Sequence, residues 1–205
     1  MSAEEALDRV YASAPDAESQ QKLYDGWAES YDHDLEVSGY ATPVRVAEML
    51  DEHLDDRGAP ILDFGCGSGM CGRALAAAGF TTIDGADLSS GMLKQADRSG
   101  IYRRSWQLTA GEIDVAPGAY RAVVACGVIS VGAAPADTLT LIASVAGPGD
   151  LLVFSYNDHT LDDPDYMATL AMLLDADFEQ LAAESGVHIA SRGSESTVYV
   201  LRRSR

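Results

Sequence analysis

The sequence predicts an α/β protein with a doubly wound, mostly parallel sheet of seven strands that ends in an antiparallel hairpin. After residue 54, short apolar runs alternate with helix-like segments, which is typical of parallel strands connected by helices. Glycines stand where the expected helices end. The last two apolar runs are separated by only four residues, 192–195, and so short a connection requires an antiparallel pair.

The expected strands are short apolar runs bounded by turn-forming residues. They cover residues 60–65, 82–87, 102–109, 121–129, 150–156, 186–191 and 196–203. The expected helices cover residues 69–78, 90–98, 135–146 and 165–185. Gly79, Gly100 and the segment 147–150 mark helix ends, and Ser89 or Ser90 is a suitable N-cap for the helix at 90–98.

The N-terminal part is predicted to be helical as well. Helices are expected at residues 3–12, 19–31 and 43–54, with a break at 13–19 and a loop at 32–43. Ser19 or Asp16 is a plausible N-cap, and Pro43 suits a helix start. We expect residues 1–45 to form a helical cap over the carboxyl edge of the sheet and residues 46–205 to form the core.

The composition restricts the class of protein. With 205 residues and 47% hydrophobic residues, the chain is expected to form one folded domain. A net charge of −18 argues against nucleic acid or an anionic membrane surface as a partner. We find neither a signal-peptide pattern nor an apolar run of roughly 20 residues. The composition does not predict an oligomeric state.

The cysteines indicate a reducing environment. Three cysteines are too few for a disulfide framework, and we expect a cytoplasmic protein. Cys66 and Cys71 lie five positions apart, but no nearby histidine or cysteine pair completes a metal-binding set. We therefore predict no metal site.

The segment ILDFGCGSGMCGRAL, residues 61–75, predicts a ligand-binding loop between a strand and a helix. It fits two patterns. Gly67, Gly69 and Gly72 match a dinucleotide fingerprint, with Asp87 twenty residues after Gly67 to bind a ribose hydroxyl. In the other pattern, Asp63 ends the strand just before a run of alternating glycines.

Asp63 favours the second pattern. A pyrophosphate at a helix N-terminus is best bound by backbone N–H groups with no carboxylate beside it. S-adenosylmethionine (SAM) has no phosphate and carries an ammonium and a sulfonium, so a nearby carboxylate is favourable. The antiparallel strand also departs from the parallel sheet of dinucleotide-binding folds. An NAD(P)-dependent oxidoreductase remains the alternative.

The motifs resemble those of the class I SAM-dependent methyltransferases. ILDFGCGSG and GADLSSGMLKQA are similar to motifs I and II of this superfamily, and residues 121–158 are similar to its fourth strand, following helix and fifth strand. The segment YDGWAESYDHDLEVSGYATP, residues 24–43, resembles small-molecule methyltransferases of the ubiquinone-biosynthesis type and the Williams–Beuren-region methyltransferase-like proteins. The resemblance implies SAM as cofactor, S-adenosylhomocysteine as product and a small-molecule methyl acceptor.

The resemblance also implies a set of cofactor-binding residues. Glycines of the loop would approach the methionyl part, Asp87 would bind the ribose, two residues after the third strand would face the adenine, and two tyrosines would cover the cofactor from the cap. The set is Tyr24, Tyr31, Asp63, Gly65, Cys66, Gly67, Asp87, Leu88, Gln107, Leu108, Cys126 and Gly127.

The catalytic residues are not identified by the sequence. His33, His159 and Tyr156 are candidates because they follow elements that end at the carboxyl edge of the sheet. Members of the family often carry Gly-His after the fourth strand, where this chain has Gly132 and Ala133. This departure, together with Arg121 where relatives often have an acid, leaves a non-catalytic SAM- or S-adenosylhomocysteine-binding protein as a further alternative.

Overall fold

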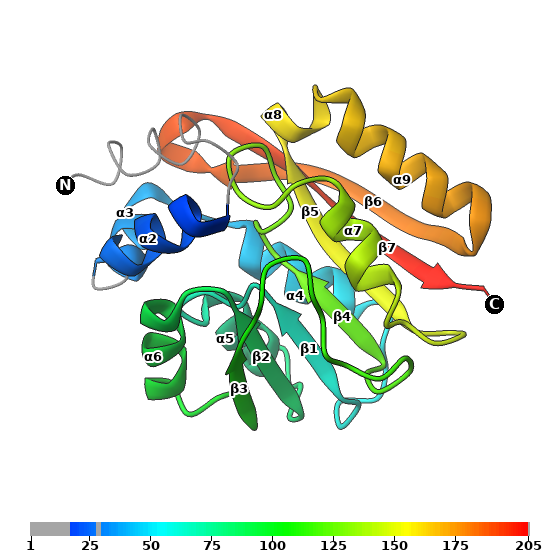
Figure 1. Cartoon of the computed structure of the whole chain (residues 1–205), viewed down its shortest axis with the longest axis horizontal. Helices are drawn as coiled ribbons and strands as arrows, with labels where there is room; N and C mark the ends of the chain where they lie inside the picture. The colour runs from blue at the N-terminus through cyan, green and yellow to red at the C-terminus, as the bar shows by residue number, and fades with distance from the viewer. Residues whose placement is uncertain (1–16, 28–29, 205) are drawn as a thin grey trace.

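The structure, a computed structural model, describes residues 17–27 and 30–204. Its centre is a single sheet with the strand order β3-β2-β1-β4-β5-β7-β6 (Figure 1). The strands are β1 (Ile61–Phe64), β2 (Ile83–Asp87), β3 (Arg104–Gln107), β4 (Ala122–Ala125), β5 (Leu151–Asn157), β6 (Phe178–Ile189) and β7 (Ser194–Arg203). This order confirms the predicted mixed sheet of seven strands.

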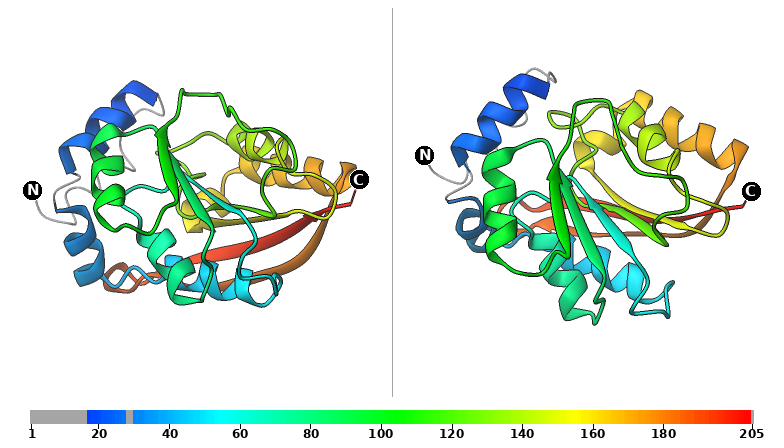
Figure 2. Two further views of the ribbon diagram at one scale, coloured as in Figure 1. Left: turned by 90° about the horizontal axis from the view of Figure 1, so that it is seen from below. Right: turned by 60° about the horizontal axis from the view of Figure 1, so that its bottom comes forward.

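Helices cover both faces of the sheet. They are α2 (Ala17–Trp27), α3 (Tyr31–Ser38), α4 (Thr42–Asp51), α5 (Met70–Ala77), α6 (Ser90–Arg98), α7 (Asp137–Ala143), α8 (Asp158–Leu161) and α9 (Pro164–Ala176), with a 3₁₀ turn at Ala190–Arg192. One apolar core joins the sheet to α7 and α9, and the other joins it to α4 and α5. Figure 2 shows these layers on the two sides of the sheet.

Successive residues of β1, β4 and β5 enter opposite cores. In β1, Ile61 packs toward α4 and α5, whereas Leu62 packs toward α7 and α9. Both side chains are fully buried. A strand buried on both faces is expected to be apolar throughout, which explains the continuous apolar runs of the sequence.

The C-terminal hairpin differs in length from the prediction. The expected helix 165–185 ends at Ala176, and β6 begins at Phe178. Residues 178–185 have the composition of a helix, but they form a ladder of antiparallel pairs with β7 that runs from Phe178–Arg203 to Ser185–Thr197. Tertiary pairing therefore overrides the local helix propensity.

The direction of β6 determines which residues reach the carboxyl edge of the sheet. Strand β7 pairs antiparallel with both β5 and β6 and lies between them. Strand β6 consequently runs in the same direction as β1–β5, and its end at Ile189 lies at the carboxyl edge. The antiparallel strand is thus the penultimate strand of the sheet, and β6 forms the edge.

The N-terminal segment contains one helix that the sequence did not predict. Residues 31–38, expected to belong to a loop, form α3, which ends at Gly39 with φ 71°. The polar sequence YDHDLEVS has few apolar residues, but Leu35 is buried in a small cluster with Trp27 and Ile189. The predicted helix 3–12 and the candidate N-cap Asp16 lie outside the described residues, and the division into a cap of residues 1–45 and a core of 46–205 remains a prediction.

The buried carboxylate of Asp84 in β2 makes a checkable contribution to stability. It accepts hydrogen bonds from Arg103 (2.9 and 2.6 Å), Arg104 (2.9 Å) and the Tyr120 hydroxyl (2.7 Å). We expect Asp84→Asn to lower the free energy of unfolding by about 2 kcal/mol, less than for a fully buried ion pair, because both arginines are more than half exposed.

Urea denaturation of this variant beside Glu179→Gln tests the expectation. Glu179 pairs with Arg202 on the surface, so its substitution is expected to change stability by less than about 0.5 kcal/mol. Equal losses in the two variants would contradict a specific role for the buried carboxylate.

Candidate functional site

The loop after β1 leaves its backbone open to a ligand. Gly65, Gly67 and Gly69 have φ values of 68°, 54° and 94°, which side-chain-bearing residues rarely adopt. A Cβ at Gly65 would lie 2.4 Å from the Val128 side chain, whereas a Cβ at Gly67 would meet no atom within 4 Å. Gly65 is therefore required by packing, and the space beside Gly67 is available to a bound molecule.

The carboxylate of Asp87 connects this loop to the end of β2. One of its oxygens accepts a hydrogen bond from the Gly67 N–H at 2.8 Å, and the other accepts from the Ser89 N–H at 2.7 Å. Burial raises the pKa of Asp87, although these two backbone hydrogen bonds oppose the change. Each carboxylate oxygen retains a second lone pair, so binding of a ribose hydroxyl remains compatible with this arrangement.

Asp63 lies below the glycine loop and is fully buried. One oxygen accepts a hydrogen bond from the Tyr102 hydroxyl at 2.7 Å, and the other has no hydrogen-bond partner among the described residues. A Cβ at Gly72 would lie 2.3 Å from that hydroxyl, so this glycine makes room for the tyrosine. Burial raises the pKa of Asp63 to about 7, with the hydrogen bond from Tyr102 acting in the opposite direction.

The predicted adenine-side residues lie together at the ends of β2 and β3. The Gln107 amide donates to the Leu88 carbonyl at 2.8 Å, which leaves its own carbonyl oxygen as an acceptor. The Leu108 N–H donates to the Asp87 carbonyl at 2.8 Å, and its side chain packs against the core. Cys66 differs from these residues, because its side chain is buried against α6 beside Leu93. Its backbone is therefore the part of Cys66 that lies nearest a ligand in the loop.

A pocket lies beside this loop, between α2 and α3 and the ends of β4, β5 and β6. Its volume is about 530 Å³, including the space at its open mouth. It is lined by Tyr24, Trp27, Tyr31, Leu35, Tyr40, Gly127, Ser130, Ser155, Asn157, His188 and Ile189. The lining combines four aromatic rings with a few polar groups and contains no carboxylate, lysine or arginine among the described residues.

Cys126 and Gly127 lie where the glycine loop and the pocket meet. The Tyr40 hydroxyl is 3.7 Å from the Cys126 sulfur, and a Cβ at Gly127 would lie 2.4 Å from the same hydroxyl. The Gly127 N–H donates to the Ser155 hydroxyl at 2.9 Å. Tyr31 lines the same pocket, and burial and the nearby Tyr24, Cys126 and Asp87 raise the pKa of its hydroxyl.

Two acidic side chains attach α2 and α3 to the loops of the sheet. Asp25 accepts hydrogen bonds from the Ser89 hydroxyl at 2.5 Å and from the Gly91 N–H at 2.8 Å. Asp32 accepts from Arg73 at 2.6 Å and from the Ser68 hydroxyl. The aromatic wall of the pocket is thereby held against the glycine loop and the start of α6.

The three catalytic candidates do not converge on the pocket. His33 and His159 are exposed, on α3 and α8. Tyr156 is fully buried among Phe154, Tyr166 and Tyr199, and its hydroxyl has no hydrogen-bond partner among the described residues. Because strand residues alternate between faces, Ser155 and Asn157 line the pocket while Tyr156 points into the core.

Sequence reasoning missed His188 as a site residue. It lies near the carboxyl end of β6 and lines the pocket, with its ring 5.2 Å from that of Tyr40 and perpendicular to it. The first strand of the expected hairpin has to run parallel to the other strands if its partner is antiparallel to them. That rule was a sufficient signal to place residues 186–189 at the same edge as the glycine loop.

The fold and the site define an α/β protein of the methyltransferase class. A methyltransferase-domain family model matches residues 31–190, and the chain belongs to this family. The human methyltransferase-like protein 27 is 33% identical over 148 residues, which cover 70% of this chain and 60% of that protein. The ubiquinone biosynthesis O-methyltransferase of Burkholderia multivorans is 33% identical over 129 residues, covering 60% of this chain and 52% of that protein.

Solved structures show the same fold. A TehB-like SAM-dependent methyltransferase from Corynebacterium glutamicum has a TM-score of 0.62 and 21% identity, over 88% of this chain and 98% of that chain. A putative methyltransferase solved in complex with the Haloferax volcanii Trm112 activator has a TM-score of 0.69 and 17% identity, over 91% and 98% of the two chains.

These matches confirm the predicted resemblance and favour the methyltransferase interpretation over the oxidoreductase. The chain spans between half and three fifths of the length of these curated relatives. Within the part of the chain that the structure describes, no helix has the length and apolarity needed to cross a membrane.

The attachment of α2 and α3 predicts a local effect of substitution. We expect the double variant Asp25→Ala, Asp32→Ala to increase amide hydrogen exchange in α2 and α3 at least tenfold, because it removes hydrogen bonds worth about 1–3 kcal/mol each. Exchange in the sheet is expected to stay unchanged. Glu18→Ala, which removes only an exposed pair with Lys22 inside α2, is the control. Unchanged exchange in the double variant would mean that aromatic packing alone holds these helices.

The raised pKa of Asp63 predicts a pH dependence of stability. The folded pKa of about 7 exceeds the unfolded value, so ionisation opposes folding, and this group lowers the free energy of unfolding as pH rises from about 4 to 7. Between pH 4.5 and pH 8, the free energy of unfolding of Asp63→Asn should therefore rise by roughly 2–4 kcal/mol relative to that of wild type. Urea denaturation at the two pH values measures this difference. Parallel stability curves for the two proteins would refute a raised pKa.

Proposed function

We propose that this chain catalyses transfer of a methyl group from SAM to a small-molecule acceptor. The observation that carries the proposal is the position of an open glycine loop, attached to the Asp87 carboxylate, next to a pocket of about 530 Å³. Membership of the methyltransferase-domain family makes this chemistry the expected one for such a pair of adjoining sites.

The residues on the glycine-loop side of the site are compatible with bound SAM. The unfilled space beside Gly67 gives a ligand access to the backbone, and Asp87 carries free lone pairs for a ribose diol. Leu88, Gln107 and Leu108 would surround the adenine. Asp63, fully buried at the end of β1 just before the loop, has one oxygen without a hydrogen-bond partner among the described residues, and a carboxylate near the loop is compatible with a cationic cofactor and unfavourable for a pyrophosphate.

The remaining predicted residues would hold the methionine end. Cys126 and Gly127 stand between the loop and the pocket, and Tyr24 and Tyr31 would cover this end from α2 and α3. The bound cofactor supplies a methyl group activated by the sulfonium. The protein's contribution is then to align the acceptor with that methyl group and to exclude water.

A small acceptor is supported by the pocket and by the charge. The pocket is a concave site whose lining combines aromatic rings with a few polar groups, which is typical of small-molecule sites. A net charge of −18 disfavours nucleic acid as the acceptor. The cysteines support our proposal of a cytoplasmic, reducing environment, because Cys66, Cys71 and Cys126 are all free thiols.

A titration of the purified chain with SAM, S-adenosylhomocysteine and NADH tests the proposal. We expect micromolar binding of the first two and none of NADH. Asp87→Ala should weaken SAM binding at least tenfold, because the variant loses both the ribose contact and the Gly67 attachment, each worth about 1–3 kcal/mol. The exposed Asp175→Ala, on α9, is the matched control and should bind as wild type does.

The outcomes separate the alternatives. Binding of NADH alone would make the chain an oxidoreductase and overturn the proposal. Binding of SAM without methyl transfer to any acceptor in a small-molecule screen would support a non-catalytic SAM-binding protein instead. Unchanged SAM affinity in Asp87→Ala would refute the assigned role of this carboxylate.

A further inference from the structure

His188 is a buried polar side chain in the pocket wall that the proposed cofactor site does not use. It lies near the end of β6, opposite the glycine loop, and is only 6% exposed. Its Nδ1 is 2.8 Å from the Thr42 hydroxyl, and its Nε2 has no partner among the described residues. Nε2 is thus the ring nitrogen left to meet a molecule in the pocket, and its protonation determines which chemistry the pocket recognises.

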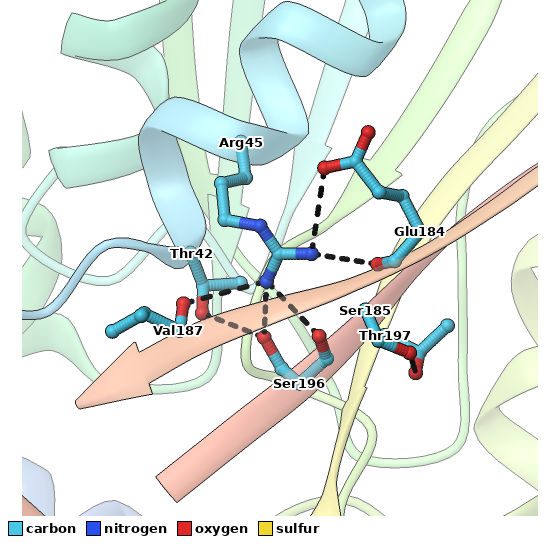
Figure 3. A network of polar contacts seen from close by, with 7 residues as sticks. All are labelled: Thr42, Arg45, Glu184, Ser185, Val187, Ser196 and Thr197. Atoms are coloured by element: carbon cyan, nitrogen blue, oxygen red, sulfur yellow. Dashed lines mark hydrogen bonds and ion pairs between the residues drawn. The ribbon is translucent and has the colours of Figure 1, made fainter. Parts of the chain in front are cut away.

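A chain of hydrogen bonds determines where the proton is. Arg45 donates to the Ser196 hydroxyl at 3.0 Å, and this hydroxyl is 3.0 Å from that of Thr42 (Figure 3). The guanidinium is fixed by further bonds to the Ser196 carbonyl (3.0 Å) and the Glu184 carbonyl (2.6 Å). An arginine can only donate, so the chain has a defined starting point.

The direction of this chain of hydrogen bonds follows because the proton of each hydroxyl needs an acceptor. Ser196 is fully buried, and its oxygen already accepts from Arg45, so its proton has the Thr42 oxygen as its hydrogen-bond acceptor. The Thr42 hydroxyl then donates to Nδ1 of His188. With Nδ1 accepting, the neutral imidazole carries its proton on Nε2. The opposite direction would leave the buried Ser196 hydroxyl proton without an acceptor, at a cost of about 1–3 kcal/mol.

The surroundings keep this imidazole neutral. Burial lowers the pKa of His188 to about 4, the nearby Arg45 lowers it further, and Asp158 raises it. At neutral pH the ring is therefore an uncharged N–H donor whose other nitrogen is occupied. It is not available as a proton acceptor at Nε2.

The rest of the lining indicates the shape of the occupant. Trp27 and Tyr40, the two aromatic rings of the lining that the proposed cofactor site does not use, present aromatic surface, which favours a flat ring. The Asn157 carbonyl oxygen accepts from the N–H and the hydroxyl of Thr160, and the Ser155 hydroxyl accepts from Gly127, so both are partly engaged within the protein. No carboxylate is among the described residues that line the pocket, and the carboxylate of Asp158, which lies near His188, already accepts a hydrogen bond from the Glu195 N–H.

We propose that His188 presents an Nε2–H donor to the pocket and selects an aromatic methyl acceptor whose oxygen receives this hydrogen bond, in preference to a cationic amine. In this inference, only the description of the occupant as a methyl acceptor rests on the proposed function. The donor itself rests on the hydrogen bonds that join β6, β7 and α4, and the preference for an oxygen over an ammonium group rests on this donor and on the lining of the pocket.

Nitrogen-15 NMR of the histidine-labelled protein tests the tautomer directly. At pH 7 we expect the His188 signals of a neutral ring protonated at Nε2, assigned by their loss in His188→Gln. Thr42→Ser keeps the hydroxyl and should keep this pattern, whereas Thr42→Val removes the hydroxyl and should abolish the preference. A wild-type ring protonated at Nδ1, or doubly protonated, would overturn the proposal.

Binding of two probes with one carbon skeleton tests the selectivity. Acetophenone offers a carbonyl oxygen, and 1-phenylethylammonium offers only a cationic donor. We expect acetophenone to bind at least tenfold more tightly in a ligand-observed NMR titration. His188→Leu should remove this preference, and His188→Gln, whose side-chain amide places an N–H at a similar position, should retain most of it.

These outcomes are independent of the proposed function because neither probe requires SAM or turnover. Preference for acetophenone in a chain that does not bind SAM would leave the pocket chemistry correct and the methyltransferase proposal wrong. Preference for the ammonium probe, or no binding of either probe, would refute the inference even if methyl transfer is observed.

Discussion

The carboxylate of Asp87 is the contact on which the candidate site depends. By accepting from Gly67 and Ser89 it fixes the glycine loop relative to the end of β2. Ser89 in turn caps α6 by accepting from the Met92 N–H at 3.0 Å, and its hydroxyl donates to Asp25 of α2. One partly buried carboxylate thus orders a loop, a helix start and the aromatic wall of the neighbouring pocket. The cost of burying it is offset because backbone donors meet both of its oxygens.

Features governed by local sequence were predictable. The strand, glycine loop and helix at residues 61–77 follow from glycines with positive φ, and the 20-residue spacing marked Gly67 and Asp87 as parts of one site, although not their hydrogen bond. The mixed sheet of seven strands followed from the alternation of strands and helices and from the short final connection, whereas the strand order was not predicted. By contrast, α3 and the first half of β6 are decided by tertiary contacts, because their own sequences favour a loop and a helix respectively.

The site residues divide in the same way. The loop side could be located from motifs, whereas the pocket side needed strand direction and the alternation of faces. Those two rules would have replaced Tyr156 by Ser155 and Asn157, and would have added His188. The contacts of Thr42 with His188 and Ser196 carry no local signal, since neither their spacing nor their composition marks them in the sequence.

The sequence separation of these contacts has a consequence for how the site assembles. The Gly67–Asp87 contact closes a loop of 20 residues, whereas the Thr42–His188 contact closes one of 146. For flexible chains the longer closure costs about 1.8 kcal/mol more entropy. The pocket wall therefore becomes favourable only after β5, β7 and β6 have paired, while the glycine loop needs only β1 and β2. If the loop binds a nucleoside and the pocket wall selects the second substrate, as proposed, the difference in closure entropy predicts that selectivity forms after nucleoside binding as the chain folds.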